Sequence, residues 1–197
     1  MNTSDISTAV RILSEGGIVI YPTDTAFGIG CRMDKRESVD RLFSIRKRPR
    51  TQATPVLVSS ADQALAYLQN PNHIVRHLMK TYWPGALTII AAVQTDSVYS
   101  PIRGGTDTIG FRMPNHETIL RIIRGVGVPI LGPSANFHGQ KTPFHEKDLD
   151  PELIRLVDMV VPGECFAGNV STVLDTTSVP VSIRRQGAVS VRSEDLA

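Results

Sequence analysis

The sequence predicts a single α/β domain over residues 1–197, with one mixed β-sheet and helices packed against it. Three observations support this fold class. The length of 197 residues suits one domain, and the 41% content of hydrophobic residues is ordinary for a globular protein. Helical and strand-like segments alternate along the chain, without internal repeats or a low-complexity linker. The seven or eight strands that can be counted fit a mixed sheet covered by helices.

The first helix is expected to begin near Ser4, because apolar residues follow it at spacings of three and four. Two consecutive glycines, Gly16 and Gly17, end this helix. Residues 18–22 and 27–33 are largely apolar and predict buried strands.

A second helix follows, with Asp34 and Glu37 spaced as in a capping box. It ends by Arg48, because Pro49 disfavours helical geometry at the residue before it. Residues 55–59 then predict another strand.

The middle of the chain predicts helices over 61–69 and 72–82 and strands over 86–93 and 108–114, with a turn at residues 83–85. The last part predicts a helix over 116–125 that Gly125 closes, a strand within 128–136 that runs into a loop, a helix near 150–158, and short strands over 159–161, 171–175 and 181–187.

Composition excludes several classes of protein. The net charge is only +2, so the chain as a whole is not a nucleic-acid-binding polycation. Cys31 and Cys165 lie far apart, which favours a reducing compartment. The first ten residues lack the pattern of a signal peptide, and the longest apolar runs are too short to span a bilayer. We therefore expect a cytoplasmic protein with no membrane partner.

The densest basic cluster is the stretch RKRPR at residues 46–50. It can be a nucleic-acid patch, a solvated helix end, or a grip for a small anionic substrate. The sequence places four glycine- and hydroxyl-rich turns beside predicted strands: YPTDTAFGIG, RGGTDTIGFR, LGPSANFHGQKTP and NVSTVLD. Such residues also make ordinary turns, so each turn alone is a weak signal. Together with the basic cluster they indicate a polar ligand site.

Familiar catalytic templates are absent, including the P-loop, a strand-linked GxGxxG and the GxSxG elbow. Nothing in the spacing favours Cys165 as a nucleophile. His73 and His77 stand four residues apart, but without the glutamate of HExxH or a third ligand nearby. A surface or capping role is the better interpretation of both histidines, and no metal site is predicted.

Seven motifs in order resemble the YrdC-like domain of threonylcarbamoyl-AMP synthases, from about residue 10 to residue 192. They are GGIVIYPTDTAFGIGC, RLFSIRKRP, YWPGALTII, DTIGFRMPNH, VPILGPSANFHGQKTP, STVLD and RRQGAVS. Each motif is modest alone, and the ordered set is specific. The resemblance implies one twisted α/β domain with a concave basic cavity, in the short form without an additional C-terminal domain.

The resemblance also implies a nucleotidyltransferase that converts L-threonine, bicarbonate and ATP to threonylcarbamoyl-AMP and pyrophosphate. Mg²⁺ is expected with the ATP, without a dedicated protein site. The product would serve the threonylcarbamoyl modification of adenosine 37 in tRNA, carried out by a separate tRNA threonylcarbamoyltransferase complex. A weak affinity for tRNA itself is compatible with the basic cluster.

Matching the family motifs to this sequence gives the candidate site residues. The catalytic set is Arg46, Arg48, Ser134 and Asn136. The ATP-binding set is Arg46, Arg50, Thr108, Ser134, Thr142 and Arg185. The threonine-binding set is Thr23, Arg112, Gly132 and Ser171. Arg46 stands where the family usually has lysine, and the loop at residues 51–54 is about two residues longer than usual. Ser59 falls where a histidine is common, so it is left out.

These residue types suit the implied chemistry. A carbamate oxygen attacks the α-phosphorus of ATP, and pyrophosphate leaves, so catalysis rests on positioning and charge stabilisation rather than on a nucleophilic side chain. Arginine donates in pairs to phosphate and carboxylate oxygens. Buried hydroxyls such as those of Thr23 and Ser171 discriminate against analogues that lack a hydroxyl. No general base is assigned, because Asp24 and Asp175 fit turn or cap roles equally well.

Two alternatives remain open. One is a diverged paralogue, similar to YciO or to the carbamoyl-adenylate-forming part of hydrogenase maturation proteins, which arginine at position 46 leaves conceivable. The other is an RNA-binding module in which RKRPR contacts phosphates. The modest net charge and the lack of interleaved aromatic residues count against the second alternative.

Overall fold

The structure, a computed structural model, describes residues 3–196. Within this range the helices are α1 (Thr3–Glu15), α2 (Arg36–Ile45), α3 (Ala61–Leu65), α4 (His73–Tyr82), α5 (Glu117–Val126) and α6 (Pro151–Leu156). The strands are β1 (Val19–Tyr21), β2 (Gly28–Gly30), β3 (Val56–Leu57), β4 (Leu87–Ala92), β5 (Thr108–Arg112), β6 (Ile130–Leu131), β7 (Met159–Val160), β8 (Thr172–Asp175) and β9 (Ser182–Arg185). Four short 3₁₀ segments complete the described elements, the last of them η4 (Ser193–Leu196).

The strands form a three-stranded set, β2-β1-β7, and a six-stranded set, β6-β3-β5-β4-β8-β9. The two sets meet where β2 runs antiparallel to the segment around β6. Bridges at Gly28–Ser134 and Arg32–Ile130 mark this seam, and the Leu131 amide donates to the Cys31 carbonyl at 2.9 Å. Parallel and antiparallel pairs both occur among the described strands, so the pairing is mixed, as predicted, and isolated bridges join the two sets.

Two glycines permit the close approach at the seam. A Cβ at Gly30 would lie 2.0 Å from the Leu131 carbonyl oxygen, and a Cβ at Gly28 would lie 2.5 Å from the Tyr21 ring. The buried Tyr21 hydroxyl donates to the same Leu131 oxygen at 2.6 Å, which ties β1 to β6 across β2. The glycine-rich motif therefore has a packing role here, because it lets the Tyr21 side chain and the Leu131 carbonyl lie directly against the β2 backbone.

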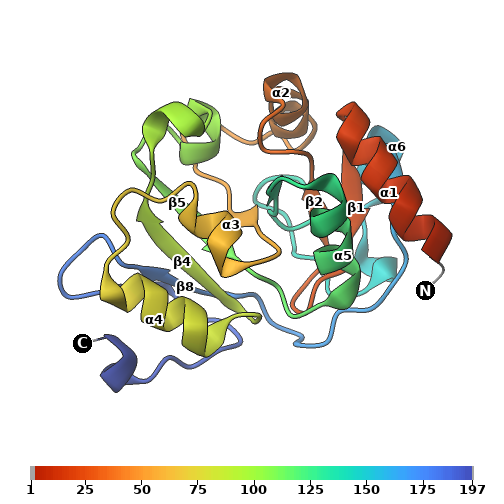
Figure 1. Ribbon diagram of the computed structural model, residues 1–197. Coiled ribbons are helices and arrows are strands. Elements are labelled where there is room, and N and C mark those ends of the chain that lie inside the picture. The colour runs from red at the N-terminus through yellow and green to blue at the C-terminus, as the bar shows by residue number, and fades with distance from the viewer. Residues whose placement is uncertain (1–2, 197) are drawn as a thin grey trace.

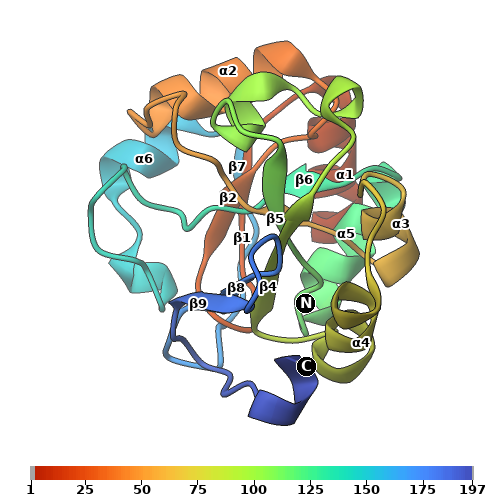
Figure 2. The same cartoon turned by 90° about the vertical axis from the view of Figure 1, so that its left-hand side faces the viewer.

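Helices cover the sheet in two groups. Helices α1 and α5 lie side by side next to β1 and β2 (Figure 1), and their apolar faces bury Leu13, Ile119 and Ile123. In Figure 2, α3 and α4 lie to one side of β4 and β5, and α6 lies to the other. Trp83, after α4, is buried and donates its indole N–H to the Leu87 carbonyl at 2.8 Å, which anchors the turn at residues 83–85 in the core.

Two predicted helix boundaries are wrong for identifiable reasons. Asp34 does not cap α2, because its carboxylate is held by the Arg32 guanidinium at 2.7 and 2.9 Å; the N-cap is Lys35, without a side-chain cap bond. Gly125 does not end α5, which continues to Val126 and stops at Gly127, where φ is 78°. A Cβ at Gly125 would lie 2.7 Å from the Val10 side chain, so this glycine serves the close packing of α1 on α5.

The remaining predicted elements are found, although several are shorter. The helix predicted over 61–69 ends at Leu65, and the one near 150–158 covers only Pro151–Leu156. No helix within residues 3–196 is long and apolar enough to cross a membrane.

Candidate active site

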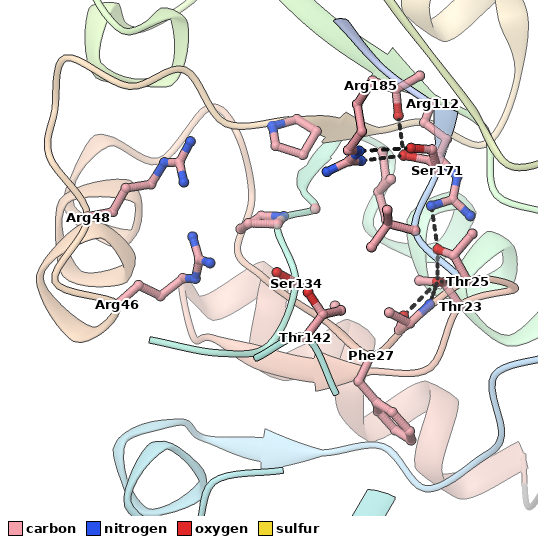
Figure 3. Close-up of a pocket in the computed structure, with 18 residues that line it drawn as sticks. Thr23, Thr25, Phe27, Arg46, Arg48, Arg112, Ser134, Thr142, Ser171 and Arg185 are labelled. Carbon is pink, nitrogen blue, oxygen red and sulfur yellow. Dashed lines mark hydrogen bonds between the residues drawn. The ribbon is translucent and has the colours of Figure 1, made fainter. Parts of the chain in front are cut away.

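A cavity of about 210 Å³ opens at the centre of the molecule, and segments from most of the chain contribute to its wall. The lining residues are Thr23, Thr25, Ala26, Phe27, Gly28, Arg46, Arg48, Pro55, Leu57, Thr88, Arg112, Gly132, Pro133, Ser134, Thr142, Val170, Ser171 and Arg185. Nine of the twelve residues that the sequence nominated are among them. Figure 3 shows Arg46 and Arg48 reaching in from one side and Thr23, Arg112, Ser171 and Arg185 facing them from the other.

The cavity is strongly basic, because four arginines line it. Of these four arginines, only Arg112 has an acidic partner, Asp24, among the ion pairs of residues 3–196. Burial lowers the pKa of Arg46, Arg48 and Arg185, as expected for guanidinium groups that have left water without a counter-charge. Three cations that face one space without carboxylates can bind a polyanion.

Arg46 is the most extreme of the three. It is only 3% exposed, and burial, with a contribution from neighbouring Arg48, lowers its pKa to about 10. Its Nε donates to the Asn136 carbonyl at 3.0 Å and its Nη2 to the Asn136 Oδ1 at 3.1 Å. Its Nη1 is buried and has no hydrogen-bond partner within residues 3–196. A buried donor without a partner is costly, and an anionic oxygen in the cavity would satisfy it.

Asn136 lies outside the cavity and forms hydrogen bonds with Arg46 and Ser134, which line it. Its Oδ1 accepts from Ser134 Oγ at 2.6 Å as well as from Arg46, and its Nδ2 donates to the Gln140 carbonyl at 2.5 Å. The Ser-x-Asn pattern and the basic pattern, 90 residues apart in the chain, are therefore joined by direct hydrogen bonds. Asn136 itself does not line the cavity, so its contribution is to hold Arg46 and Ser134.

Arg48 is anchored by its own loop. Its Nε donates to the Gln52 carbonyl at 3.1 Å, its Nη2 donates to the Ala53 carbonyl, and its Nη1 lies 3.3 Å from His138 Nδ1. The loop at residues 51–54 therefore supplies the acceptors that keep Arg48 at the cavity. Lys47, between the two arginines, is exposed, and its ammonium lies over the Phe137 ring at 4.9 Å.

The opposite wall holds a buried arginine in a polar cradle. Arg112 Nε donates to the Gly85 carbonyl at 3.0 Å, Nη1 donates to Thr25 Oγ1 at 2.7 Å, and Nη2 pairs with Asp24. Two of its five N–H groups are left for a ligand. Thr23 Oγ1 accepts from the Thr25 and Ala26 amides at 3.1 and 3.2 Å and so shapes the turn beside this arginine.

Hydroxyl groups link this wall to Arg185. Ser171 Oγ lies 2.9 Å from Thr88 Oγ1, and Arg185 donates to the Ser171 carbonyl at 3.0 Å and to its Oγ at 3.1 Å. Pairing of β8 with both β4 and β9 brings these three residues together.

Two nominated residues lie away from the cavity. Arg50 is exposed and pairs with Asp40 of α2 at 2.9 Å, so the cluster RKRPR divides, with Arg46 and Arg48 at the cavity and Arg50 on α2. Thr108 begins β5, whose other end carries Arg112. A strand advances about 3.3 Å per residue, which separates Thr108 from Arg112 by roughly 13 Å. Residues 103–108 of the turn RGGTDTIGFR are not among the residues that line the cavity, whereas Arg112 at its other end is.

The sequence analysis missed two polar residues of the cavity, Thr25 and Thr88. Thr25 was within reach, because it belongs to the same TDT turn as Thr23. Thr88 is the one hydroxyl in the apolar stretch ALTIIAAV, and that isolation was the available signal.

The candidates set aside from the sequence also have structural explanations. His77 Nε2 lies 2.6 Å from Asp195 Oδ1 and thereby connects α4 with η4. Burial raises the pKa of the Cys165 thiol, which disfavours the thiolate that a nucleophile needs. Within residues 3–196 no cluster of three or more His, Cys, Asp or Glu side chains could hold a metal ion.

Comparison with known proteins identifies the family to which this chain is similar. The Sua5, YciO and YrdC family model, described as "Telomere recombination", matches residues 11–187. The threonylcarbamoyl-AMP synthase of Bacillus subtilis is 33% identical over 200 aligned positions, which cover 98% of this chain and 56% of that protein.

Solved structures agree with this result. The crystal structure of Pyrococcus abyssi Sua5 complexed with L-threonine is 30% identical with a TM-score of 0.86, over 92% of this chain and 54% of that one. Escherichia coli YciO matches with a TM-score of 0.87 over 100% of this chain and 94% of its own, at 23% identity, which supports the fold. The chain spans just over half the length of the Bacillus and Pyrococcus proteins. On the family model and these relatives together, the chain belongs to the Sua5/YciO/YrdC family.

Proposed function

We propose that this chain is a nucleotidyltransferase that converts L-threonine, bicarbonate and ATP to threonylcarbamoyl-AMP and pyrophosphate. The observation that carries the proposal is the group of three buried or partly buried arginines, Arg46, Arg48 and Arg185, that face one cavity without an acidic partner among the described residues. The similarity to a threonylcarbamoyl-AMP synthase and to a Sua5 structure with L-threonine supports it.

The chemistry requires two bond-forming steps. The threonine amine and bicarbonate give an N-carboxylate and water. One oxygen of this carbamate then attacks the α-phosphorus of ATP, and the bond to the β-phosphate oxygen breaks to release pyrophosphate. Negative charge grows on the leaving group and on the equatorial oxygens during this step. Donors already fixed in position stabilise that charge without reorganisation.

The residues divide between the two ends of the cavity. Arg46, Arg48 and Ser134 would hold and stabilise the phosphates, with Asn136 fixing Arg46 and Ser134, while Thr142 and Arg185 would add ATP contacts. Arg112 would bind the threonine carboxylate with its two remaining N–H groups, and Thr23, Ser171 and the backbone at Gly132 would line the rest of that end. Arg50 and Thr108 do not line the cavity, and their assignment to ATP remains a prediction.

The donors in the cavity are guanidinium and hydroxyl groups, and the nearby carboxylate of Asp24 is occupied by Arg112. This set does not form a cage for Mg²⁺, so we expect the ion to arrive on the ATP phosphates with its own waters. The product would then pass to a separate tRNA threonylcarbamoyltransferase complex in the cytoplasm.

The direct test measures pyrophosphate release from ATP with L-threonine and bicarbonate, with each omitted in turn. Release that requires both, with threonylcarbamoyl-AMP identified by mass spectrometry, supports the proposal. Folded protein that releases no more pyrophosphate than the threonine-free control overturns it.

Arginine at position 46 leaves one alternative open, a diverged paralogue with carbamoyl-adenylate chemistry, although Arg48, Ser134 and Asn136 keep the family pattern. That enzyme would release pyrophosphate from ATP with carbamate, supplied as ammonium carbamate, in place of L-threonine and bicarbonate. A carbamate oxygen would attack the α-phosphorus, and pyrophosphate would leave. The same assay with ammonium carbamate separates the two functions.

A further inference from the structure

Thr88 is a buried hydroxyl residue on the cavity wall that neither the family motifs nor the proposed mechanism gives a role. It lies in β4 among apolar neighbours and is only 4% exposed. A Cβ at Gly110 on the adjacent strand β5 would lie 2.9 Å from the Thr88 methyl group. The missing side chain at Gly110 therefore leaves room for this methyl group, which directs the hydroxyl toward Ser171.

Counting the hydroxyl hydrogens of Thr88 and Ser171 shows that one of them has no acceptor in the described residues. Arginine can only donate, so Ser171 Oγ must be the acceptor in its 3.1 Å contact with Arg185 Nη2. The two hydroxyls of Thr88 and Ser171 carry two hydrogens, and their mutual bond of 2.9 Å uses one of them. The other hydrogen has no acceptor among the hydrogen bonds of the described residues and lies at the cavity wall.

A serine hydroxyl held only by Arg185 could adopt more than one rotamer and turn its hydrogen away from the cavity. Thr88 adds a second fixed contact from a different strand, so Ser171 Oγ lies between β4 and β9. A side chain fixed by two buried groups presents its hydrogen-bonding atoms in one place, which lowers the entropy lost when a ligand binds.

We propose that Thr88 is a positioning residue for substrate: by holding Ser171 against Arg185, it sets the direction in which this hydroxyl pair donates its remaining hydrogen to an oxygen of L-threonine. The inference rests on the proposed function for the identity of the ligand. The proposal also predicts a selective effect. Loss of the Thr88 hydroxyl should weaken the binding of L-threonine at the amino acid end of the cavity and leave the use of ATP largely unchanged.

The experiment is a double-mutant cycle of Thr88→Val and Ser171→Ala, with L-threonine binding measured by calorimetry and KM for L-threonine and ATP measured by pyrophosphate release. Thr88→Val removes the hydroxyl and keeps the shape. We expect it to weaken L-threonine binding and raise KM for L-threonine about 3- to 10-fold, as for one net hydrogen bond, while kcat and KM for ATP change less than about twofold. Thr88→Ser, which restores the hydroxyl, should recover most of the loss.

The cycle separates positioning from general damage. If Thr88 acts through Ser171, Thr88→Val has no further effect on L-threonine binding in the Ser171→Ala background. Thr176→Val is the matched control, since it removes another buried hydroxyl, which donates to the Ile90 carbonyl at 2.8 Å away from the cavity. It should lower thermal stability and leave KM for L-threonine unchanged. Additive losses, or equal losses for L-threonine and ATP, would overturn the proposal.

A crystal structure of the Thr88→Val protein provides a readout that does not depend on activity. We expect Ser171 to change rotamer or to occupy several. A Ser171 hydroxyl that stays in place against Arg185 would contradict the positioning role, even if the wild-type protein binds L-threonine. Failure of wild-type protein to bind L-threonine or release pyrophosphate would instead count against the proposed function, and the crystal structure would still decide the role of Thr88.

Discussion

Arg46 shows most directly how a single residue placed to bind a ligand can lower the stability of the folded protein. Its guanidinium is almost fully buried, lacks a carboxylate partner within the described chain and keeps one nitrogen without a hydrogen bond. A buried charge of this kind destabilises the folded state, and phosphate oxygens would remove the penalty when ATP binds.

Replacing Arg46 should therefore separate activity from stability. We expect Arg46→Met to reduce pyrophosphate release on the order of 10²- to 10³-fold, as for a lost transition-state donor. The melting temperature should stay the same or rise, because the charge that is removed was buried without a partner. Arg46→Lys keeps a charge but loses both bonds to Asn136, so its activity should fall between those of the wild type and of Arg46→Met.

The control is Arg11→Met, which removes an exposed guanidinium that pairs with Glu15 on the surface of α1. Its activity should match the wild type. Near-normal activity of Arg46→Met would show that the charge is not part of the reaction. A large gain for Arg46→Lys would instead indicate that the protein has drifted from the chemistry of its family.

Several residues of the cavity wall could be anticipated from fixed local patterns in the sequence. Arg46, Arg48 and Ser134 stand in recognisable patterns, and Arg112 ends a predicted strand. Thr88 could not be found this way, since its role depends on which strand lies next to β4. The position of Arg50 outside the cavity could not be found either, because its pairing with Asp40 depends on the path of the loop after Pro49.

At the scale of elements, one carboxylate joins three segments. Asp158, just after α6, accepts from the Ile18 amide at 2.7 Å at the start of β1, and it binds the Arg41 guanidinium of α2 at 2.6 and 3.1 Å. These bonds, above all those from Arg41, hold the pKa of Asp158 below its ordinary value of 3.8. The ionised form therefore stabilises the contact between α2, β1 and the end of α6.

Asp158→Asn should lower the free energy of unfolding by about 1–2 kcal/mol near pH 7, an amount limited by the partial exposure of the carboxylate. Because the folded pKa is lowered, the contribution is present above the ordinary value and is lost as pH falls through the folded value. Urea denaturation should therefore show a difference between the two proteins at pH 7 that shrinks below about pH 4. A constant difference across this range would contradict the role of the charge.

Element boundaries illustrate what local patterns can and cannot predict. The spacing of Asp34 and Glu37 fits a capping box. The Arg32 guanidinium, however, donates two hydrogen bonds to the Asp34 carboxylate, which is therefore not available to cap α2. Gly125 looks like a helix end, yet its lack of a side chain serves contact with Val10, a residue of another helix. In both cases a partner outside the local pattern decided the outcome.

At the scale of the whole molecule, the cavity draws on segments from Thr23 to Arg185, so ligands should stabilise the entire fold. A ligand at 100 times its Kd adds about 2.7 kcal/mol, or roughly 5–10 °C in melting temperature for a chain of this size. We expect separate increases with L-threonine and with Mg²⁺-ATP, and a larger one with both together. The check is a thermal-shift series with D-threonine and GTP as controls. No increase with any ligand would contradict an assembled binding site.

The sequence predicted the fold class and most elements, because periodicity and turn residues are local. The order of strands could not be worked out in the same way. Nothing in the sequence around Val19 indicates that β1 pairs with β2 on one side and with β7 on the other, or that β2 then joins β6 at a seam. Those pairings depend on the global burial of apolar faces, which no local pattern in the sequence records.

The pairing of β1 with β7 has a consequence for synthesis on the ribosome. Val19 lies opposite Met159, so the first strand waits for a partner made 140 residues later. At 5–20 residues per second this wait is roughly 7–28 s. During that interval one edge of β1 presents unpaired backbone groups, which can pair with another chain. Nascent chains of this protein are therefore most vulnerable to edge-to-edge association before residue 160 emerges.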